Sequence, residues 1–523
     1  MTASTTRIIR GCAFAAVCAL AGAIGWAQGR AIGFDWPATG ADAQRTAWLR
    51  LDPNISVANL SKPGFEFLWR EKLDNAPRQS MSLHQGVTMN GLIGFTPASF
   101  VTGVSNSVFA VDNDTGFPVW NRRFDATLPA PTAACPGGMT GASGRVVSLV
   151  REALQLPAPS GPGAGYRGGI GAPGEGVPMD IARRDGGAAL RGEKPAPAAR
   201  RGGGGGVFAG RYAGPIYVVP SNGMLHTLGQ VSGVDVERPV PFLPANSRYS
   251  DLTAVGDMLY TSTSHDCGGT PNGVWAITLD AQKKSVSSWK TNGGSPVGNL
   301  SFTTAGKILV AIGAGRAGAG GYANAIVALD AKTLQPTDWF SAPASEFVTT
   351  PVVFNVGGRE IVAAAARDRV FLLDAAALGG ADHATPLFAL SSSNLAPDAL
   401  AVFEQPAGTS WLLVPSARSV VSYRIVQEGS KLGLQHGWTS REIPTPVAPI
   451  VVNDVVFAAS SGRGQGAAVL YALDSRTGRE LWNSGKTITS PIPPANLWAS
   501  NSQVHVGALD GTVYAFGFVL ERR

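Results

Sequence analysis

Charged side chains are scarce in this sequence and make up 15% of its 523 residues, whereas apolar residues make up 44%. A protein built from amphipathic helices carries a charged face on each helix, so this scarcity disfavours an all-helical fold. The apolar fraction is ample for a buried core, which excludes global disorder. Glycine (66 residues) and proline (36 residues) are plentiful and favour short strands joined by tight turns.

Cysteine and histidine are also few. The chain has four cysteines and six histidines, with no Cys-x-x-Cys-His motif for a covalent haem and no His-x-His pair, so we predict no metal site. Cys12 and Cys18 lie in the N-terminal apolar stretch described next, which leaves Cys135 and Cys267. In an oxidising compartment a single remaining pair usually forms a disulfide, and we predict one here.

The beginning of the chain has the pattern of a secretory signal peptide. Arg7 and Arg10 form a basic start, and an apolar stretch follows from residue 11 to residue 26. We expect residues 1–27 to be removed, leaving residues 28–523 in the periplasm or secreted. The alternative, an uncleaved membrane anchor, is disfavoured because the apolar stretch is short for a bilayer span. No second segment is long and apolar enough to span a membrane.

The net charge of +6 does not indicate a nucleic-acid partner. Much of the basic excess lies in the predicted signal peptide and in residues 151–206, and the rest of the chain is close to neutral. Binding to nucleic acid depends on a basic surface, so we expect no nucleic-acid partner.

An internal repeat is the strongest pattern in the chain. Residues 108–120 read Val-Phe-Ala-Val-Asp-Asn-Asp-Thr-Gly-Phe-Pro-Val-Trp, and residues 470–482 read Leu-Tyr-Ala-Leu-Asp-Ser-Arg-Thr-Gly-Arg-Glu-Leu-Trp. In each copy a strand ends at an Asp that can cap the turn, Gly tolerates a positive φ, and a second strand carries Trp between neighbouring sheets. Weaker copies end at Trp289 and Trp339. In the two strong copies we assign a structural role, in the turn and in packing between blades, to Asp112, Thr115, Gly116, Trp120, Asp474, Thr477, Gly478 and Trp482.

Large aromatic residues end such units along the whole chain, at a spacing of about 50 residues that matches one propeller blade. The eight are Trp69, Trp120, Phe242, Trp289, Trp339, Phe388, Trp438 and Trp482. The last unit lacks its final strand, and residues 65–69 near the start of the chain can supply it. We therefore predict a single all-β domain, an eight-bladed β-propeller closed by the N-terminal strand.

One unit is interrupted by residues 140–206, which are rich in Gly, Pro, Ala and Arg. Such a composition buries too little apolar surface to order itself. We predict a flexible surface insertion in the unit that ends at Phe242. The alternative is a lid or a partner-binding arm.

The repeat and the N-terminal region resemble the pyrroloquinoline-quinone (PQQ) dehydrogenase family. The N-terminal residues similar to its quinoprotein alcohol dehydrogenases are Asp35, Trp36, Pro37, Gly40, Asp42, Leu51, Ile55, Asn59, Leu60 and Trp69. If the chain is a dehydrogenase of this family, the resemblance implies a quinone on the propeller axis, held between a Trp and a disulfide of adjacent cysteines. It also implies a Ca²⁺ ion and an Asp that acts as a base. The same blades occur in non-catalytic relatives, including the propeller lipoprotein of the outer-membrane assembly machinery.

This sequence has no adjacent cysteines, and no Asp stands out as a base. The pattern favours an exported, quinoprotein-like propeller that is non-catalytic and serves in binding or as a scaffold. The alternative is a PQQ- and calcium-dependent alcohol or sugar dehydrogenase. No catalytic residue can be assigned. We expect a protein, a glycan or a small ligand to bind at one propeller face.

Three glycine-containing loops occupy the same place in their units, between the second and third strands, and carry His265, Arg316 and Arg463. Residues 313–318 also match the dinucleotide fingerprint Gly-x-Gly-x-x-Gly, but a strand follows where the fingerprint needs a helix, so we reject the match. In a propeller these loops share one face with the connections between blades. We predict that His265, Arg316 and Arg463 form a rim that can contact an anionic ligand. The alternative is three ordinary hairpin loops.

Overall fold

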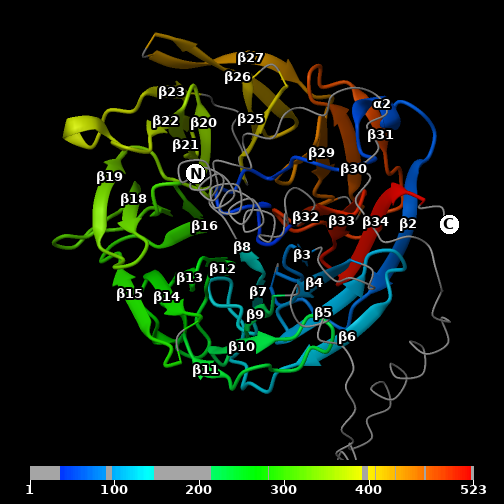
Figure 1. The fold of residues 1–523 in the computed structure, drawn as a ribbon. Helices are drawn as coiled ribbons and strands as arrows, with labels where there is room; N and C mark the ends of the chain where they lie inside the picture. Colours follow the sequence, from blue (N-terminus) through cyan, green and yellow to red (C-terminus); the bar gives the residue numbers. More distant parts are fainter. Residues whose placement is uncertain are drawn as a thin grey trace, which may run out of the picture.

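The strands form eight sheets arranged in a ring, which Figure 1 shows along the ring axis. The computed structural model describes residues 36–79, 81–89, 97–146, 214–280, 282–391, 399–406, 408–429, 431–464 and 467–519. Each sheet is a blade of four antiparallel strands, and two blades gain a short parallel strand on their inner side. The predicted all-β, eight-bladed propeller is confirmed.

The blades are numbered from the first complete one along the chain. Blade 1 contains β3 (Val87–Met89), β4 (Ala98–Thr102), β5 (Ser107–Asp112) and β6 (Pro118–Arg123), and blade 2 contains β7 (Gly141–Ser143), β9 (Ile216–Val219), β10 (Met224–Leu228) and β11 (Val240–Pro241). Blade 3 contains β12 (Thr253–Val255), β13 (Met258–Thr263), β14 (Gly273–Thr278) and β15 (Val286–Lys290), with β8 (Arg145–Val146) inside it. Blade 4 contains β16 (Pro296–Phe302), β17 (Lys307–Ile312), β18 (Ala325–Asp330) and β19 (Pro336–Ser341).

The second half of the ring follows the same order. Blade 5 contains β20 (Val352–Val356), β21 (Arg359–Ala365), β22 (Arg369–Asp374) and β23 (Phe388–Ser391), and blade 6 contains β24 (Ala401–Glu404), β25 (Ser410–Pro415), β26 (Val420–Glu428) and β27 (Lys431–Thr439). Blade 7 contains β28 (Ile450–Val452), β29 (Val455–Ser460), β30 (Val469–Asp474) and β31 (Glu480–Asn483), with β1 (Trp48–Leu49) inside it. Blade 8 contains β32 (Leu497–Ser500), β33 (Gln503–Gly507), β34 (Thr512–Phe518) and β2 (Phe65–Lys72). The short helices are α2 (Val57–Leu60), η3 (Cys267–Gly269) and η4 (Gly380–Asp382).

The N-terminal strand closes the ring, as predicted. β2 pairs antiparallel with β34, from Phe65 opposite Phe518 to Lys72 opposite Thr512, and Figure 1 shows the blue β2 beside the red β34. The ring of Phe65 also packs edge-on against Trp482 of blade 7, with the ring centroids 5.0 Å apart. The first part of the chain therefore binds the last two blades together.

Tryptophans of the outermost strands pack flat on glycine turns of the next blade. The three pairs are Trp69 with Gly116, Trp120 with Gly233, and Trp438 with Gly478. A Cβ on any of these glycines would lie 2.5 or 2.6 Å from the indole, and all three have a positive φ. Each indole Nε1–H also donates to a backbone oxygen of the same turn, at 2.8 Å. Glycine is required in these turns both for its φ and for the close approach of the ring.

Aspartates cap the same turns. The Asp112 carboxylate accepts hydrogen bonds from the N–H groups of Asp114 and Thr115, at 2.8 and 3.0 Å, and Asp474 accepts one from Arg476 at 2.8 Å. Such Asx turns satisfy backbone donors that the strands leave free. The repeat motif is therefore a turn that presents a flat, capped surface to an indole.

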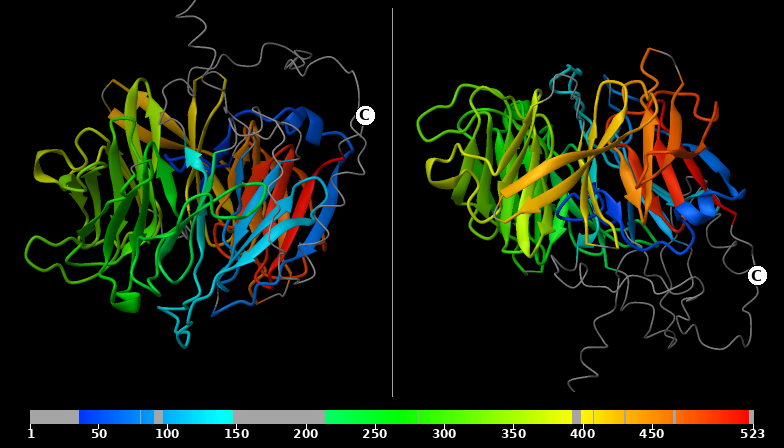
Figure 2. Two further views of the ribbon diagram at one scale, coloured as in Figure 1. Left: turned by 60° about the horizontal axis from the view of Figure 1, so that its bottom comes forward. Right: turned by 90° about the horizontal axis from the view of Figure 1, so that it is seen from above.

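Figure 2 shows the sheets standing side by side around the ring, seen from two further directions. We call the face that carries the loops between second and third strands, together with the connections between blades, the upper face. The opposite face, at the turns between first and second strands, is the lower face. The β26–β27 hairpin is the longest in the described part of the chain, with nine residues in each strand, and its Leu432 belongs to the same core cluster as Phe354 of blade 5.

Residues 36–49 run around the inside of the ring near the lower face. Backbone oxygens of this inner segment accept hydrogen bonds from the innermost strands of blades 1, 4, 5, 6 and 7, at 2.8–2.9 Å. The donors are the N–H groups of Thr88, Phe302, Val353, Val402 and Val451. Side chains of the segment reach blade 3, and Asp52, just beyond it, accepts hydrogen bonds from Ser502 of blade 8. The hub of the ring is thus made by the beginning of the chain.

The predicted signal peptide, residues 1–27, lies outside the described residues. The predicted insertion, residues 140–206, overlaps them only at its start, where β7 and β8 belong to blades 2 and 3. Among the described residues, no helix is long and apolar enough to cross a bilayer.

Candidate functional site

The three predicted rim residues lie in loops of the upper face but on different blades. His265 follows β13 in blade 3, Arg316 follows β17 in the neighbouring blade 4, and Arg463 follows β29 in blade 7. All three are exposed. Blade 7 stands across the ring from blade 3, so the structure brings His265 and Arg316 into one region but separates Arg463 from them.

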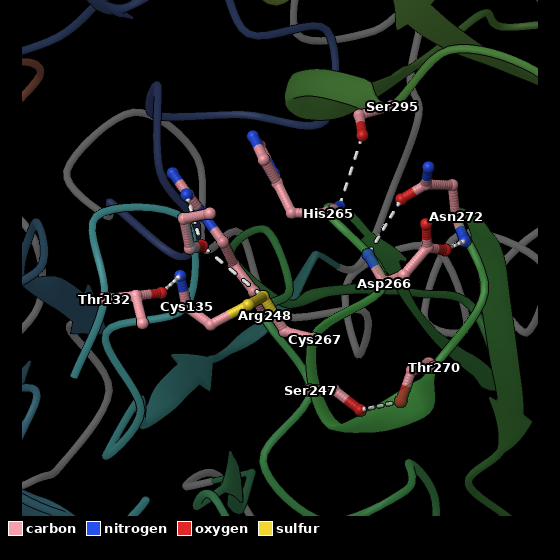
Figure 3. Close-up of a disulfide and its surroundings, with 11 residues drawn as sticks. Thr132, Cys135, Ser247, Arg248, His265, Asp266, Cys267, Thr270, Asn272 and Ser295 are labelled. Atoms are coloured by element: carbon pink, nitrogen blue, oxygen red, sulfur yellow. Dashed lines mark hydrogen bonds between the residues drawn. A yellow bond between two sulfur atoms is a disulfide. The ribbon is translucent and has the colours of Figure 1, made fainter. Parts of the chain in front are cut away.

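The predicted disulfide between Cys135 and Cys267 is present, with the Cα atoms 5.6 Å apart, as Figure 3 shows. Cys135 lies in the connection from blade 1 to blade 2, and Cys267 lies in the upper loop of blade 3. Arg248 donates to the carbonyl oxygen of Ala134 at 2.7 Å, beside the disulfide. The bridge therefore spans blade 2 and fixes the loop that carries His265.

Arg45 lies at the hub with 3% of its surface exposed. Its guanidinium donates to the carbonyl oxygen of Leu300 at 2.7 Å, to the carbonyl oxygen of Thr39 and to the hydroxyl of Thr253. Burial lowers the pKa of Arg45 to about 10, although the nearby Asp251 and Asp42 act to raise it. The side chain therefore stays charged at neutral pH and connects the inner segment to blades 3 and 4.

Asp251 and His84 meet above the inner segment. Asp251 lies just before β12 and His84 just before β3, and the Asp251 carboxylate is 3.4 Å from His84 Nδ1. The same carboxylate accepts a hydrogen bond of 2.7 Å from the hydroxyl of Thr39. Burial by itself raises the pKa of Asp251, but His84, the Thr39 hydrogen bond and the charge of Arg45 outweigh it and lower that pKa below its usual value. Asp251 is therefore ionised at neutral pH.

His84 leaves one polar atom unused. Its side chain is 15% exposed, and its Nε2 is buried with no hydrogen-bond partner among the described residues. A buried ring nitrogen without a partner is uncommon, because most such groups bind protein, water or a ligand. A carboxylate that holds Nδ1 while Nε2 stays available can orient the ring toward a ligand hydroxyl or amide.

Sequence reasoning missed Asp251 and His84. Both lie outside the repeat motif, in connections between blades that differ from one another in sequence. They are 167 positions apart along the chain, and the arrangement of blades 1 to 3 around the axis brings them together. Arg45 lies inside the N-terminal region that carries the family resemblance, but nothing in its neighbours indicates a buried guanidinium.

No group of three or more His, Cys, Asp and Glu side chains that could hold a metal ion occurs in the described part of the chain. Among the residues that the structure places, the pair Asp251 and His84 has no third such ligand beside it. Its neighbours are the hydroxyl of Thr39, the guanidinium of Arg45 and the amide of Asn299, whose Oδ1 accepts from the Asp251 N–H at 2.9 Å.

Comparison with known proteins gives the class of fold. No family model and no curated protein matches the chain. Among solved structures, the quinohemoprotein alcohol dehydrogenase from Comamonas testosteroni aligns with a TM-score of 0.57 and 13% identity, over 94% of this chain and 81% of that one. A europium-containing methanol dehydrogenase aligns with a TM-score of 0.54 and 12% identity, over 93% and 98% of the two chains.

BamB from Moraxella catarrhalis aligns less closely, with a TM-score of 0.46 and 12% identity over 87% of this chain and 100% of that one. The two dehydrogenase alignments, at 12–13% identity, show the fold and not the activity. The chain therefore has the eight-bladed propeller fold of the quinoprotein dehydrogenases.

Proposed function

We propose that this chain is an exported propeller of the periplasm or the extracellular space that binds a ligand or partner protein at its upper face and is not a dehydrogenase. The observation that carries this proposal is that the polar groups at the axis already bind one another. Asp251 accepts from Thr39 and contacts His84, and Arg45 is fully engaged with backbone and hydroxyl oxygens. These groups stabilise the hub.

A quinone bound as the family resemblance implies does not fit the described residues. Cys135 and Cys267 bond to each other at the upper rim instead of forming a ring of adjacent cysteines on the axis. The inner segment's Trp36 is fully buried and donates its Nε1–H to Gln85 at 3.0 Å, so this indole has no face open for stacking. No redox step is therefore assigned to the chain.

The upper end of the axis supports a binding role. His84 Nε2 needs a hydrogen-bond partner, and it lies among connections between blades, where a propeller presents its loops to a ligand. A ligand hydroxyl or amide that reaches this nitrogen would supply the missing hydrogen bond. In this proposal His84 contacts the ligand, and Asp251 positions the His84 ring.

Reconstitution tests the absence of dehydrogenase activity. The mature chain, residues 28–523, is mixed with PQQ and Ca²⁺, and quinone absorbance and dye-linked oxidation of alcohols and sugars are followed beside a working quinoprotein dehydrogenase. We expect neither a spectral change nor turnover. Saturable quinone binding with substrate oxidation would refute the proposal.

Fractionation tests the location. The full chain with a C-terminal tag is expressed in a Gram-negative host, and the tagged protein is sequenced from its N-terminus. We expect a periplasmic or secreted product that begins at Gln28. Recovery of the uncleaved chain from the cytosol or the membrane fraction would contradict export and cleavage.

A further inference from the structure

A pocket of about 570 Å³ lies at the outer part of blade 4, away from the axis. Eleven residues line it, and none of them is charged. Two are the aromatic residues Tyr322 and Trp339, two are the polar residues Asn324 and Ser341, and three are glycines, including Gly320. The lining belongs to the loop that carries Arg316 and to β18, β19 and the residues just after β19.

The pocket exists because Trp339 does not take the docking position of the repeat. In blade 1 the docking residue Trp120 pairs with Ala110, whereas the corresponding Ala328 of blade 4 pairs with Asp338. The Asp338 carboxylate accepts a hydrogen bond of 2.8 Å from a backbone N–H of blade 5. Successive side chains of a strand point to opposite faces, so Trp339 is directed toward blade 3. It packs there against the core between blades 3 and 4.

Three aromatic side chains gather at this place. The ring centroid of Tyr322 lies 5.7 Å from that of Trp289 of blade 3 and 6.0 Å from that of Trp339. The imidazole of His383 stacks on Trp339 with a centroid distance of 3.7 Å and an interplanar angle of 18°. His383 covers one face of this indole and fixes its orientation, and all four side chains remain partly exposed.

The loop over the pocket is held in place by backbone hydrogen bonds to the connection from blade 3. The Tyr322 N–H donates to Thr291 at 3.0 Å, and the Tyr322 carbonyl oxygen accepts from Gly294 at 2.8 Å. The Gly318 N–H donates to Asn292 at 2.9 Å. The pocket is thus preformed, which reduces the entropy lost when a ligand binds.

We propose that this pocket, which is separate from the site at His84, binds a neutral saccharide, an inference that goes beyond the proposed function. The C–H face of a sugar ring packs on an aromatic ring, and its hydroxyls need polar partners beside that ring. The Oδ1 atom of Asn324 is buried without a hydrogen-bond partner among the described residues, and it can accept from a hydroxyl. The side chain of Ser341 and the backbone around Gly320 supply further polar groups.

The chemistry of the lining excludes other ligand classes. A purely apolar ligand offers Asn324 Oδ1 no hydrogen-bond donor, whereas a sugar hydroxyl does. A charged ligand finds no side chain of opposite charge in the lining. A cavity of about 150 Å³ accepts one benzene ring, so a pocket of this size accepts about two sugar rings with some water.

Titration with sugars tests the proposal. The mature chain is titrated with neutral disaccharides of glucose, galactose and N-acetylglucosamine, followed by tryptophan fluorescence and calorimetry. We expect saturable binding of at least one of them. Trp339→Ala should weaken it more than tenfold, and Trp339→Phe, which keeps a ring, by about threefold or less. Phe117→Ala removes an aromatic residue that is 69% exposed on blade 1 and should change nothing.

A second variant keeps the proposal testable if Trp339→Ala unfolds the protein. Gly320 has a φ of +66° and open space around a Cβ, and Asn tolerates this φ, so Gly320→Asn should fold normally while narrowing the pocket. We expect unchanged melting and more than tenfold weaker binding. The inference is overturned if no neutral disaccharide binds, if both pocket variants bind as wild type does, or if only charged sugars or aromatic amines bind. Quinone turnover would instead refute the proposed function and leave the sugar titration as a separate result.

Discussion

Replacing Gly478 with Ala tests the contact on which the propeller repeat depends. Gly478 has a φ of +70°, and a Cβ there would lie 2.5 Å from the ring of Trp438, which is 6% exposed. Gly485, in the same blade, has a φ of +56° and no atom within 4 Å of its Cβ position. The two substitutions share the cost of a left-handed backbone and differ in the clash with an indole.

The expected magnitudes follow from this difference. A left-handed non-glycine residue costs about 1–2 kcal/mol, so Gly485→Ala should lower the free energy of unfolding by about 1 kcal/mol. Gly478→Ala also displaces the Trp438 ring, which loses its packing and its 2.8 Å hydrogen bond to the turn. The lost packing and hydrogen bond should lower the free energy of unfolding by about a further 2–4 kcal/mol, as for other changes that disturb a large buried side chain.

Urea unfolding followed by circular dichroism measures both variants, and a double-mutant cycle with Trp438→Ala isolates the contact. In the Trp438→Ala background, Gly478→Ala should cost only the backbone term, about 1 kcal/mol, because the ring is gone. Equal costs for Gly478→Ala and Gly485→Ala, or additive costs in the cycle, would refute the docking argument.

Four further substitutions test the ring, the hub and the rim. Trp482→Ala should destabilise by about 3 kcal/mol, the lower end for a Trp, because its half-buried ring packs on the closing strand. His505 is fully buried, and burial lowers its pKa to about 3. Below pH 6.5 the unfolded chain therefore binds a proton at this histidine and the folded chain does not, so the free energy of unfolding should fall by about 2 kcal/mol between pH 7 and pH 5. His505→Phe should lack this pH-dependent loss. Arg45→Met should cost about 3 kcal/mol because it leaves the buried carboxylate beside it without its charge partner. Replacing Cys135 and Cys267 with Ala should cost about 2–5 kcal/mol and remove the effect of reductant on the melting temperature.

Thermal melts and urea midpoints, taken at several pH values, measure all four. Arg441→Met is the control for Arg45, since Arg441 is 53% exposed in its ion pair, and it should change stability by about 0.5 kcal/mol or less. An unchanged pH profile in His505→Phe would contradict the histidine argument. Melting that is insensitive to reductant in the wild type would contradict the disulfide argument.

The blades and their closure could be predicted from sequence because their physics is local. Asp112, Gly116 and Trp120 lie within one hairpin, and the same spacing at Asp474, Gly478 and Trp482 marks a second copy. Trp69 near the start then supplies the strand that the last unit lacks. The cysteines could be paired because two remain after the predicted signal.

The hub could not be predicted in this way. Arg45, His84 and Asp251 come from three distant parts of the chain, and no local pattern sets them apart from solvent-exposed residues. The outer pocket left a weak signal: Trp339 is one residue further from its turn Asp330 than Trp120 is from Asp112. In a strand that shift reverses the side on which the indole lies.

The inner segment also sets an order of events in folding. Residues 36–49 are synthesised before every blade they contact, and their partners Val402 and Val451 come some 350 to 400 positions later. Pairings between positions so far apart form slowly, because a long loop must close before they contribute. The nascent chain must therefore keep Thr46 and Ala47 unpaired until blades 6 and 7 exist, and early capture of these residues by another strand would trap an open ring.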